Sequence, residues 1–390
     1  MCEFIFNEFL KNNLDFDSEL LNLLKANDII KFHQSLDGYV PTPLVSLNQM
    51  AEKFGVNEIL VKDESKRFNV NAFKPLGASY AIYRLIKKEW EVKFDSHFKL
   101  EYLFDTVKMR KLGSFVFSAA TDGNHGRGVA WMSKRIGQEA KIFMPKDTKQ
   151  ARIDNIEKEG AEVVIINGTY DDCVREVSIR SKENDWYEVG DTAYEGYTEI
   201  PTWVAAGYST IFNEIKEILD KGKFNIPDIV FLQAGVGAFA AAGTGFFRMN
   251  YKDKNIKLVC VEPIEAAGFF DSMKFGDGRA IEARGEMKTI MAGLNCGIPS
   301  TIAWPVLKDS VNMFLTISDN YAEDAMREYK KAGIISGESG ASGLAGFLSI
   351  MNNEKLIEAK KKLNITKNTN ILLISTEGNT DPETYNKIVT

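Results

Sequence analysis

The feature that most constrains this 390-residue chain is the regular alternation of short apolar runs with segments of helical periodicity. Apolar runs bounded by turn residues predict buried strands, and the segments that follow them predict helices. Repeated strand-helix units place parallel strands side by side, with helices on both faces of the sheet. The sequence therefore predicts an α/β protein built on open, twisted parallel sheets.

The expected elements fall into two groups along the chain. Strands are predicted at Ile59–Lys62, Phe115–Ser118, Ala140–Phe143, Glu162–Ile166, Ile229–Leu232, Ile256–Val261, Met313–Thr316 and Ile371–Ile374. Helices are predicted at Leu47–Phe54, Tyr80–Ile86, His125–Ile136, Lys149–Glu159, Tyr170–Lys182, Pro201–Leu219 and Ala238–Phe247. Because the chain is longer than a usual single domain, we expect a large domain of residues 1–75 and 196–390 and a small domain of residues 76–195.

Two segments fit this alternation poorly. Residues 1–28 form an acidic amphipathic region, for which helix packing or a subunit contact is the simplest interpretation. Residues 87–111 are polar and charged, which predicts a solvated insertion.

Composition narrows the class of protein. The net charge of −6 and the lack of a basic block argue against a nucleic acid or an anionic membrane as partner. The few cysteines and histidines show no spacing typical of metal ligands; they are Cys2, Cys173, Cys260, Cys296, His33, His97 and His125. The N-terminus lacks the pattern of a signal peptide. We expect a reduced, metal-free, cytoplasmic protein.

One uncharged stretch, Ile229 to Phe247, approaches the length of a membrane span. The Gly235-Val236-Gly237 turn interrupts it, which predicts a strand followed by a helix of small residues.

Lys74 stands between a predicted strand and a predicted helix, in the stretch Asn71 to Ala78. Pro75 suits the first turn of a helix, so the lysine is expected on rigid backbone at the helix start. The helix dipole and any burial there disfavour the ammonium form, and a neutral amine is the form that attacks a carbonyl to make a Schiff base. For a lone lysine, a solvated side chain at a helix start is the simpler interpretation.

A glycine loop, Ala234 to Ala238, follows a predicted strand and opens a helix. Backbone N–H groups at such a turn bind a phosphate without any cationic side chain. The glycines and Ala240 also fit the dinucleotide fingerprint, with Glu262 placed for a ribose. Lys74 favours the monophosphate, because a dinucleotide domain does not require it.

Three further loops carry polar groups suited to a ligand. Thr121 to Gly126 follows the strand at Phe115–Ser118, where its N–H groups can bind a carboxylate. Read alone, this loop is equally an ordinary turn. Gly190 to Tyr197, and the pair Ser336 to Gly340 with Ser375 to Asn379, supply acids, hydroxyls and close backbone approach.

Taken together, these motifs resemble pyridoxal-phosphate enzymes of the tryptophan synthase β-like fold, and among them the diaminopropionate ammonia-lyases. The resemblance extends from about Pro41 to Asp381 and includes the Ile290-Met291-Ala292-Gly293-Leu294 stretch. Related dehydratases usually carry serine where Asp122 stands, so the aspartate is the more specific feature. No cysteine partner for Cys296 exists between Glu262 and Asp271, so no structural disulfide is carried over.

The resemblance implies a role for each motif. Pyridoxal phosphate would be linked to Lys74, with its phosphate on Gly235, Val236, Gly237 and Ala238. Asn124 would meet the ring hydroxyl, and Ser375, with Glu338 nearby, would face the pyridine nitrogen. Asp122 and Asp191 would be the catalytic acids. They would bind substrate together with Thr121, Gly123 and His125.

The implied reaction belongs to amino-acid degradation: elimination of D- and L-2,3-diaminopropionate to pyruvate and ammonia by a homodimer. Asp122 would serve the D-isomer and Asp191 the L-isomer. An anionic residue near Cβ favours a substrate with a cationic side chain. The alternatives are a serine or threonine dehydratase-like lyase, a nicotinamide-dependent oxidoreductase, or a non-catalytic small-ligand sensor.

Overall fold

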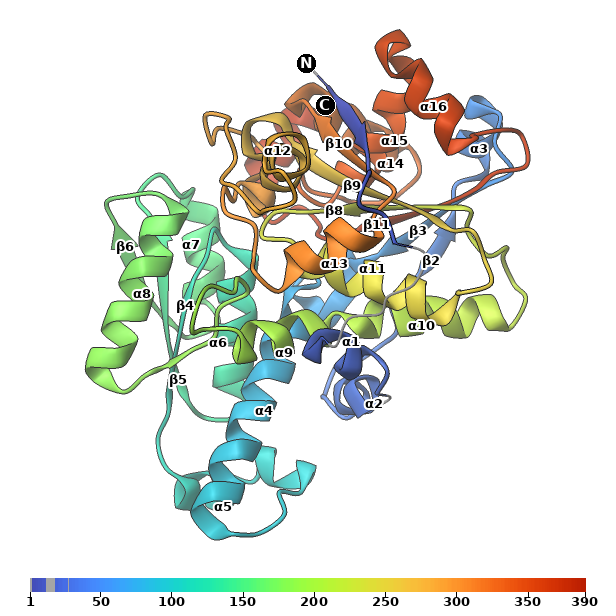
Figure 1. The fold of residues 1–390 in the computed structure, drawn as a ribbon. Coiled ribbons are helices and arrows are strands. Elements are labelled where there is room, and N and C mark those ends of the chain that lie inside the picture. Colours follow the sequence, from blue (N-terminus) through green and yellow to red (C-terminus); the bar gives the residue numbers. More distant parts are fainter. Residues whose placement is uncertain (1, 12–17, 27) are drawn as a thin grey trace.

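The computed structural model describes residues 2–11, 18–26 and 28–390, which form two sheets covered by helices (Figure 1). The wide sheet has seven strands in the order β1-β10-β9-β8-β11-β3-β2. Their bounds are β1 Phe4–Phe6, β2 Leu44–Ser46, β3 Glu58–Asp63, β8 Ile229–Gln233, β9 Lys257–Pro263, β10 Met313–Ile317 and β11 Asn370–Ser375. Its five inner strands run parallel, and β1 and β2 pair antiparallel at the two edges.

The small sheet has four parallel strands in the order β6-β5-β4-β7. They are β4 Val116–Ala120, β5 Glu139–Pro145, β6 Glu162–Ile166 and β7 Tyr187–Glu188. In Figure 1 this sheet and its helices form a separate lobe, at the side of the wide sheet.

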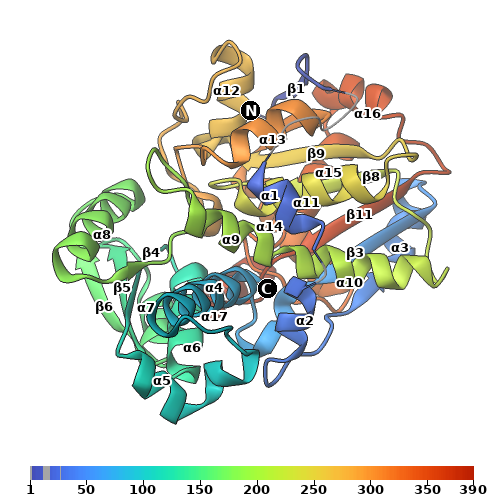
Figure 2. The same cartoon turned by 60° about the horizontal axis from the view of Figure 1, so that its bottom comes forward.

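Helices lie between the strands along the chain (Figure 2). They are α1 Glu19–Leu24, α2 Asp28–Gln34, α3 Asn48–Phe54, α4 Lys74–Phe94, α5 Thr106–Leu112, α6 Asn124–Arg135, α7 Gln150–Glu157, α8 Tyr170–Asn184, α9 Glu199–Gly207, α10 Ser209–Asp220, α11 Ala238–Asn250, α12 Gly268–Phe275, α13 Ala303–Ser310, α14 Asp319–Lys331, α15 Ser342–Asn352, α16 Ile357–Leu363 and α17 Pro382–Val389.

The apolar runs are continuous because both faces of the wide sheet are buried. In β8, Val230 and Leu232 pack into the core that contains α10 and α11. Ile229 and Phe231 point the other way, into the core that contains α14 and α15. Alternate residues of a strand face opposite sides, so a parallel strand buried on both faces is apolar at most of its positions.

The predicted fold class is confirmed, and each predicted strand is present with its ends shifted by no more than two residues. The uncharged stretch from Ile229 divides into β8 and α11, as expected. No helix within the described ranges is long and apolar enough to cross a membrane. The small-sheet strands all lie between residues 116 and 188, while the exact domain boundaries stay a prediction.

Three predictions differ from the structure. The edge strands β1, β2 and β7 were not predicted, because two or three residues are too few to show a period. The helix predicted at Pro201–Leu219 is two helices, α9 and α10, which meet at Tyr208. The solvated insertion at residues 87–111 is wrong, because α4 continues into it, α5 begins within it, and four of its apolar side chains are buried: Trp90, Phe98, Leu103 and Met109.

Residues 28–34 tie the N-terminal region to the helix that starts at Lys74. His33 on α2 is fully buried, with Nδ1 2.6 Å from the Thr210 hydroxyl and Nε2 2.9 Å from the carbonyl oxygen of Leu76. Burial lowers the pKa of His33 to about 3, so the neutral ring donates one hydrogen bond and accepts the other. Helix α2 therefore holds the first turn of α4. Residues 12–17 and 27 of the amphipathic region lie outside the described residues.

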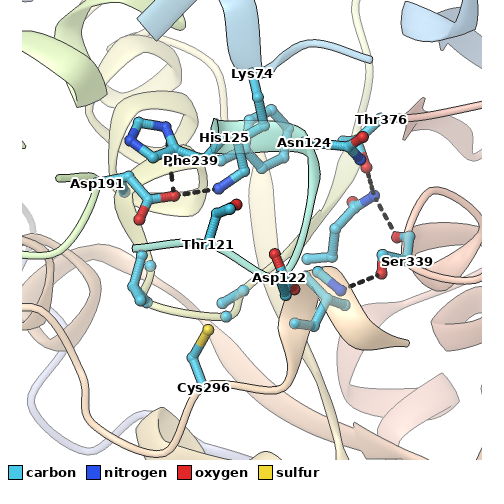
Figure 3. A pocket seen from close by; sticks show the side chains of 18 of the residues that line it. Lys74, Thr121, Asp122, Asn124, His125, Asp191, Phe239, Cys296, Ser339 and Thr376 are labelled. Atoms are coloured by element: carbon cyan, nitrogen blue, oxygen red, sulfur yellow. Dashed lines mark hydrogen bonds and ion pairs between the residues drawn. The ribbon is translucent and has the colours of Figure 1, made fainter. Parts of the chain in front are cut away.

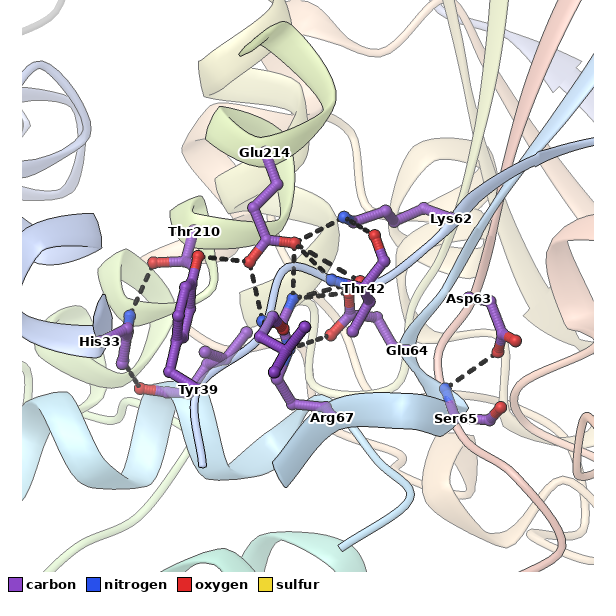
Figure 4. A network of polar contacts seen from close by, with 12 residues as sticks. His33, Tyr39, Thr42, Lys62, Asp63, Glu64, Ser65, Arg67, Thr210 and Glu214 are labelled. Atoms are coloured by element: carbon purple, nitrogen blue, oxygen red, sulfur yellow. Dashed lines mark hydrogen bonds and ion pairs between the residues drawn. The ribbon is translucent and has the colours of Figure 1, made fainter. Parts of the chain in front are cut away.

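A buried ion network lies beside this contact (Figure 4). Glu214 on α10 accepts hydrogen bonds from Lys62 Nζ at 2.5 Å and from Arg67 Nη1 at 2.7 Å. Arg67 also donates to Glu64 through Nε at 2.8 Å. The four side chains are fully buried and carry two charges of each sign, so each charge is compensated. The network joins β3 to α10.

We expect Glu214→Ala to lower the free energy of unfolding by about 3–5 kcal/mol, because it leaves two buried cations without their carboxylate. Glu199→Ala removes an exposed ion pair with Lys88, and should cost about 1 kcal/mol or less. Urea denaturation followed by circular dichroism measures both. Equal, small losses in the two variants would contradict a stabilising role for the network.

Candidate active site

Lys74 is the first residue of α4, with Pro75 next in the first turn. The Phe73 ring packs 4.7 Å from that of Tyr208 and 5.0 Å from that of Phe239, measured between ring centroids. These contacts fix the start of the helix. The Lys74 ammonium donates a hydrogen bond to the carboxylate of Asp191 (Figure 3). The expected placement of Lys74 at a helix start is confirmed.

The expectation of a neutral Lys74 amine is wrong for this structure. Burial lowers the pKa of Lys74, as expected, but the carboxylate of Asp191 has the opposite effect, and the net direction is upward. The partner lies 117 residues away in sequence, so local sequence could not show it. The charged amine and Asp191 form a buried ion pair.

The Thr121 to Gly126 loop follows β4 and leads into α6. The Thr121 Oγ1 atom accepts hydrogen bonds from the N–H groups of Gly123 at 2.9 Å and Gly126 at 3.0 Å, so it caps the start of the helix. Asp122 faces the cavity in Figure 3. Its Oδ2 atom is buried and has no hydrogen-bond partner among the described residues. Burial raises the pKa of Asp122 to about 6.

Asp191 follows β7 and has several partners. Its carboxylate accepts a hydrogen bond from Lys74 and another from the Tyr170 hydroxyl, the latter at 3.2 Å. The Nδ1 atom of His125 is 3.9 Å away, and its Nε2 atom lies 2.6 Å from the carbonyl oxygen of Val189. Burial raises the pKa of Asp191, but Lys74 and these donors outweigh it and set the pKa at about 2. The pKa values of the two acids are thus shifted in opposite directions, upward for Asp122 and downward for Asp191.

The glycine loop joins β8 to α11, and Gly237 is the residue before the helix. Gly237 has φ +93°, and a Cβ atom there would lie 2.2 Å from Cζ of Phe269. A Cβ atom at Gly235 would lie 3.0 Å from Cα of Leu294. Both positions therefore require glycine, and the loop that opens α11 lines the cavity. This is the arrangement that binds a phosphate.

These groups surround one cavity. It lies where β4, β7, β8 and β11 end, the place where ligands collect in open α/β sheets. Its walls contain Phe73, Lys74, Ala120, Thr121, Asp122, Asn124, His125, Tyr170, Asp191, Gln233, Ala234, Gly235, Val236, Gly237, Ala238, Phe239, Gly293, Leu294, Cys296, Ser339, Thr376 and Glu377. Most residues predicted from sequence are thus brought together.

Of the described residues, neither Ser375 nor Glu338 lines the cavity. The strand β11 extends through Ser375, whose hydroxyl donates to Ser336 Oγ at 2.8 Å. Thr376 is the next residue and lies on the cavity wall, because successive residues of an extended chain face opposite sides. Thr376 therefore brings a hydroxyl to the cavity wall where the sequence predicted Ser375. Gly123, predicted to bind substrate, is likewise not among the described residues that line the cavity.

Sequence reasoning missed several wall residues. Glu377 accepts hydrogen bonds from the side chain of Asn124 and from the N–H of Ser339, the latter at 3.2 Å. Glu377, Asn124 and Ser339 all lie in loops that the sequence analysis singled out. Which of them contact one another depends on the fold. Tyr170 opens α8 and carries no sequence signal that separates it from other surface tyrosines.

Glu262, which the dinucleotide interpretation assigned to a ribose, has a structural role. It is fully buried and accepts hydrogen bonds from the N–H groups of Phe269 at 2.8 Å and Phe270 at 2.7 Å. Its carboxylate therefore caps α12. Its burial raises its pKa to about 8. Glu262, the acid that a dinucleotide site would need for its ribose, is therefore already hydrogen-bonded to the backbone of α12.

The cysteines agree with the expected lack of a disulfide. Cys2, Cys173, Cys260 and Cys296 are all described, and all are buried free thiols.

The cavity fits pyridoxal phosphate. Lys74 supplies an amine, the glycine cradle before α11 supplies phosphate donors, and the wall acids surround the space between them. Comparison with known proteins agrees. Residues 36–376 match the family of pyridoxal-phosphate dependent enzymes, and the chain belongs to that family.

The relatives narrow the class further. The diaminopropionate ammonia-lyase of Escherichia coli strain K12 is 40% identical over 379 residues, which cover 95% of this chain and 93% of that protein. Two crystal structures of the Escherichia coli enzyme each have a TM-score of 0.89 at 37% identity, and cover 100% of this chain and 97% of theirs. One holds an aminoacrylate-PLP azomethine reaction intermediate, and the other holds D-serine.

Proposed function

We propose that this protein is a pyridoxal-phosphate-dependent ammonia-lyase that converts D- and L-2,3-diaminopropionate to pyruvate and ammonia. The observation that carries the proposal is the pairing of Lys74 with Asp191 in a cavity whose wall holds a second acid, Asp122. A dehydratase for serine or threonine has no comparable need for two acids, since its substrates lack a side-chain cation.

The charge of the wall supports the substrate. Its ionisable groups include the acids Asp122, Asp191 and Glu377 against one lysine. Such a wall attracts a substrate whose Cβ carries an ammonium group, and favours it over a neutral hydroxyl. The N–H groups of the Thr121 to Gly126 loop, at the start of α6, are the donors that would bind the substrate carboxylate.

When bound, pyridoxal phosphate supplies an electron-withdrawing ring that stabilises the electron pair left on Cα. Lys74 would hold the cofactor covalently, Gly235 to Ala238 would bind its phosphate, and Thr376 would meet its ring nitrogen. Asn124 would meet the ring hydroxyl, and Glu377, which accepts a hydrogen bond from its side chain, would orient its amide.

The chain's own acids move the proton. A carboxylate, Asp122 or Asp191 according to the isomer, takes the Cα proton. The Cα–H and Cβ–N bonds break, a Cα=Cβ bond forms, and the β-ammonium group leaves as neutral ammonia with the electron pair of the Cβ–N bond. The released aminoacrylate takes up water to give pyruvate and a second ammonia. The buried Phe73 and Phe239 on the wall limit the access of water to the reacting carbon.

A pyruvate-release assay with diaminopropionate, serine and threonine tests the proposal. We expect diaminopropionate to give the highest kcat/KM of the three. A higher value for serine or threonine would make the protein a dehydratase. A yellow colour that borohydride bleaches separates this function from the oxidoreductase and the sensor, since neither needs an imine on Lys74.

We also place the enzyme in the cytoplasm as a homodimer. Four buried free thiols are typical of a reducing compartment. Size-exclusion chromatography with light scattering measures the oligomeric state, and a monomer would reject the dimer.

The glycine cradle gives a separate prediction. Gly237→Val places a side chain against Phe269 and in a strained backbone conformation, so the N–H groups of the loop move. Losing one charge-assisted hydrogen bond costs about 1.5–3 kcal/mol, which weakens cofactor binding about 10- to 100-fold. Fluorescence titration with pyridoxal phosphate measures the dissociation constant.

Gly222→Val is the matched control. Gly222 also has a positive φ, +69°, but no described atom lies within 4 Å of its Cβ position. This variant bears the backbone strain without touching the cradle, so it should bind cofactor as the wild type does. Wild-type affinity in Gly237→Val would assign the loop another role.

A further inference from the structure

Arg152 lies directly behind the Asp122 loop, outside the cavity wall. It is the third residue of α7 and is 7% exposed. Its Nη1 atom donates a hydrogen bond to the backbone carbonyl oxygen of Asp122 at 3.1 Å. The next residue, Gly123, has φ +154°, and a Cβ atom there would lie 3.4 Å from Cδ of Arg152. The loop thus packs its backbone directly on the arginine side chain.

The surroundings of Arg152 are acidic. Its charge interacts with Glu377, Asp122, Glu338 and Asp381. Glu338, which does not reach the cavity, therefore belongs to the cluster around this guanidinium. The same helix contacts the C-terminal segment through Lys149 and Asp381, 2.8 Å apart. Arg152 is held between the small-sheet lobe and the loop after β11, and it cannot turn away from Asp122 without leaving several buried acids uncompensated.

We propose that Arg152 is a positioning residue for Asp122, which fixes the Asp122 backbone and keeps its carboxylate charged. This inference rests on the proposed function, in which Asp122 is the base for one substrate isomer. Asp191 receives no such support from Arg152, because its own partners are Lys74 and Tyr170. Arg152 therefore controls the turnover of one isomer and leaves the other nearly unchanged.

Only a few charged groups act on the Asp122 carboxylate, and the effect of each on its pKa can be considered in turn. The groups facing it are the cations Arg152 and Lys74, the acids Asp191 and Glu377, and the neutral groups Tyr170 and Cys296. Burial is the main effect on the carboxyl and raises its pKa, and Arg152 is the largest of the charge effects that lower it. Removing Arg152 must raise the pKa further.

The test compares Arg152→Gln with Arg152→Lys, which keeps a cation, in the holoenzyme. Asp122→Asn first identifies the isomer that depends on Asp122. For that isomer we expect Arg152→Gln to lower kcat/KM about 10-fold or more and to move the acidic limb of its pH profile upward by about one unit. Arg152→Lys should keep the limb near its wild-type position. Arg175→Gln, at an exposed site on α8, is the control for losing an arginine.

A ¹³C NMR titration of aspartate carboxyl groups gives a readout that does not depend on turnover. The Asp122 signal is assigned by its loss in Asp122→Asn, and it should titrate at higher pH in Arg152→Gln only. An unchanged Asp122 titration, or equal losses for both isomers with an unmoved acidic limb, overturns the proposal. If the wild type releases no pyruvate from either isomer, the proposed function fails, while the titration still decides the role of Arg152.

Discussion

Lys74→Ala is expected to abolish pyruvate release while the chain stays folded. The variant loses the amine that would attach the cofactor, and the loss of a nucleophile that acts as part of a catalytic unit costs ~10⁴-fold or more in turnover. Borohydride reduction followed by denaturing mass spectrometry should show a pyridoxyl adduct on Lys74 in the wild type and no adduct in the variant. Circular dichroism checks that the fold is retained.

Lys66→Ala is the control for this experiment, because Lys66 is exposed and belongs to the segment between β3 and α4. It should keep both the adduct and the activity. The reduced adduct on a lysine other than Lys74 would reject the assignment. Loss of Lys74 also leaves Asp191 without its cation, so the pKa of Asp191 should rise in the variant.

The sequence predicts the inner strands well because their physical signal is local. A parallel strand buried on both faces is mostly apolar, as β8 is from Ile229 to Leu232, and the run shows this directly. The same holds for Lys74 and Pro75, whose spacing from the preceding strand defines a helix start. The glycine loop could also be predicted from the sequence, because Gly235 and Gly237 stand at positions where the fold has no room for a larger residue.

The features that sequence reasoning missed depend on contacts between distant segments. A shift of one residue at the end of β11 exchanged Ser375 for Thr376 on the cavity wall, and boundaries are the least certain part of any pattern. The charge state of Lys74 depends on Asp191, and the support of Asp122 depends on Arg152. No local period carries that information, because the partners meet only after both sheets have formed.

The second large effect concerns the two acids, which are expected to act on different substrate isomers. D- and L-substrates, bound through the same cofactor, present the Cα hydrogen on opposite sides, and one carboxylate cannot reach both. Asp122 and Asp191 reach the cavity from different loops, after β4 and β7. Losing a positioned base costs ~10²–10⁴-fold. Asp122→Asn should therefore depress turnover of the D-isomer by about that factor, and Asp191→Asn that of the L-isomer.

The pKa values of the two acids add a pH signature to this prediction. Asp122 has its pKa raised to about 6, so it takes up a proton as the pH falls through 6 and can no longer act as a base. Asp191 has its pKa lowered to about 2 mainly by the Lys74 ammonium, so it stays ionised there while the two groups form an ion pair. In the wild type, turnover of the isomer served by Asp122 should fall below about pH 6, while turnover of the other isomer continues to lower pH.

Steady-state assays of both isomers with each variant, across this pH range, decide between two bases and a structural role. Asp171→Asn is the control, because Asp171 lies on α8 beside Tyr170 and does not line the cavity among the described residues. It should change neither isomer selectively. If Asp191 only holds Lys74 in place, Asp191→Asn will lower turnover of both isomers alike through weakened cofactor binding. Equal losses for the two isomers in both variants would reject the two-base mechanism.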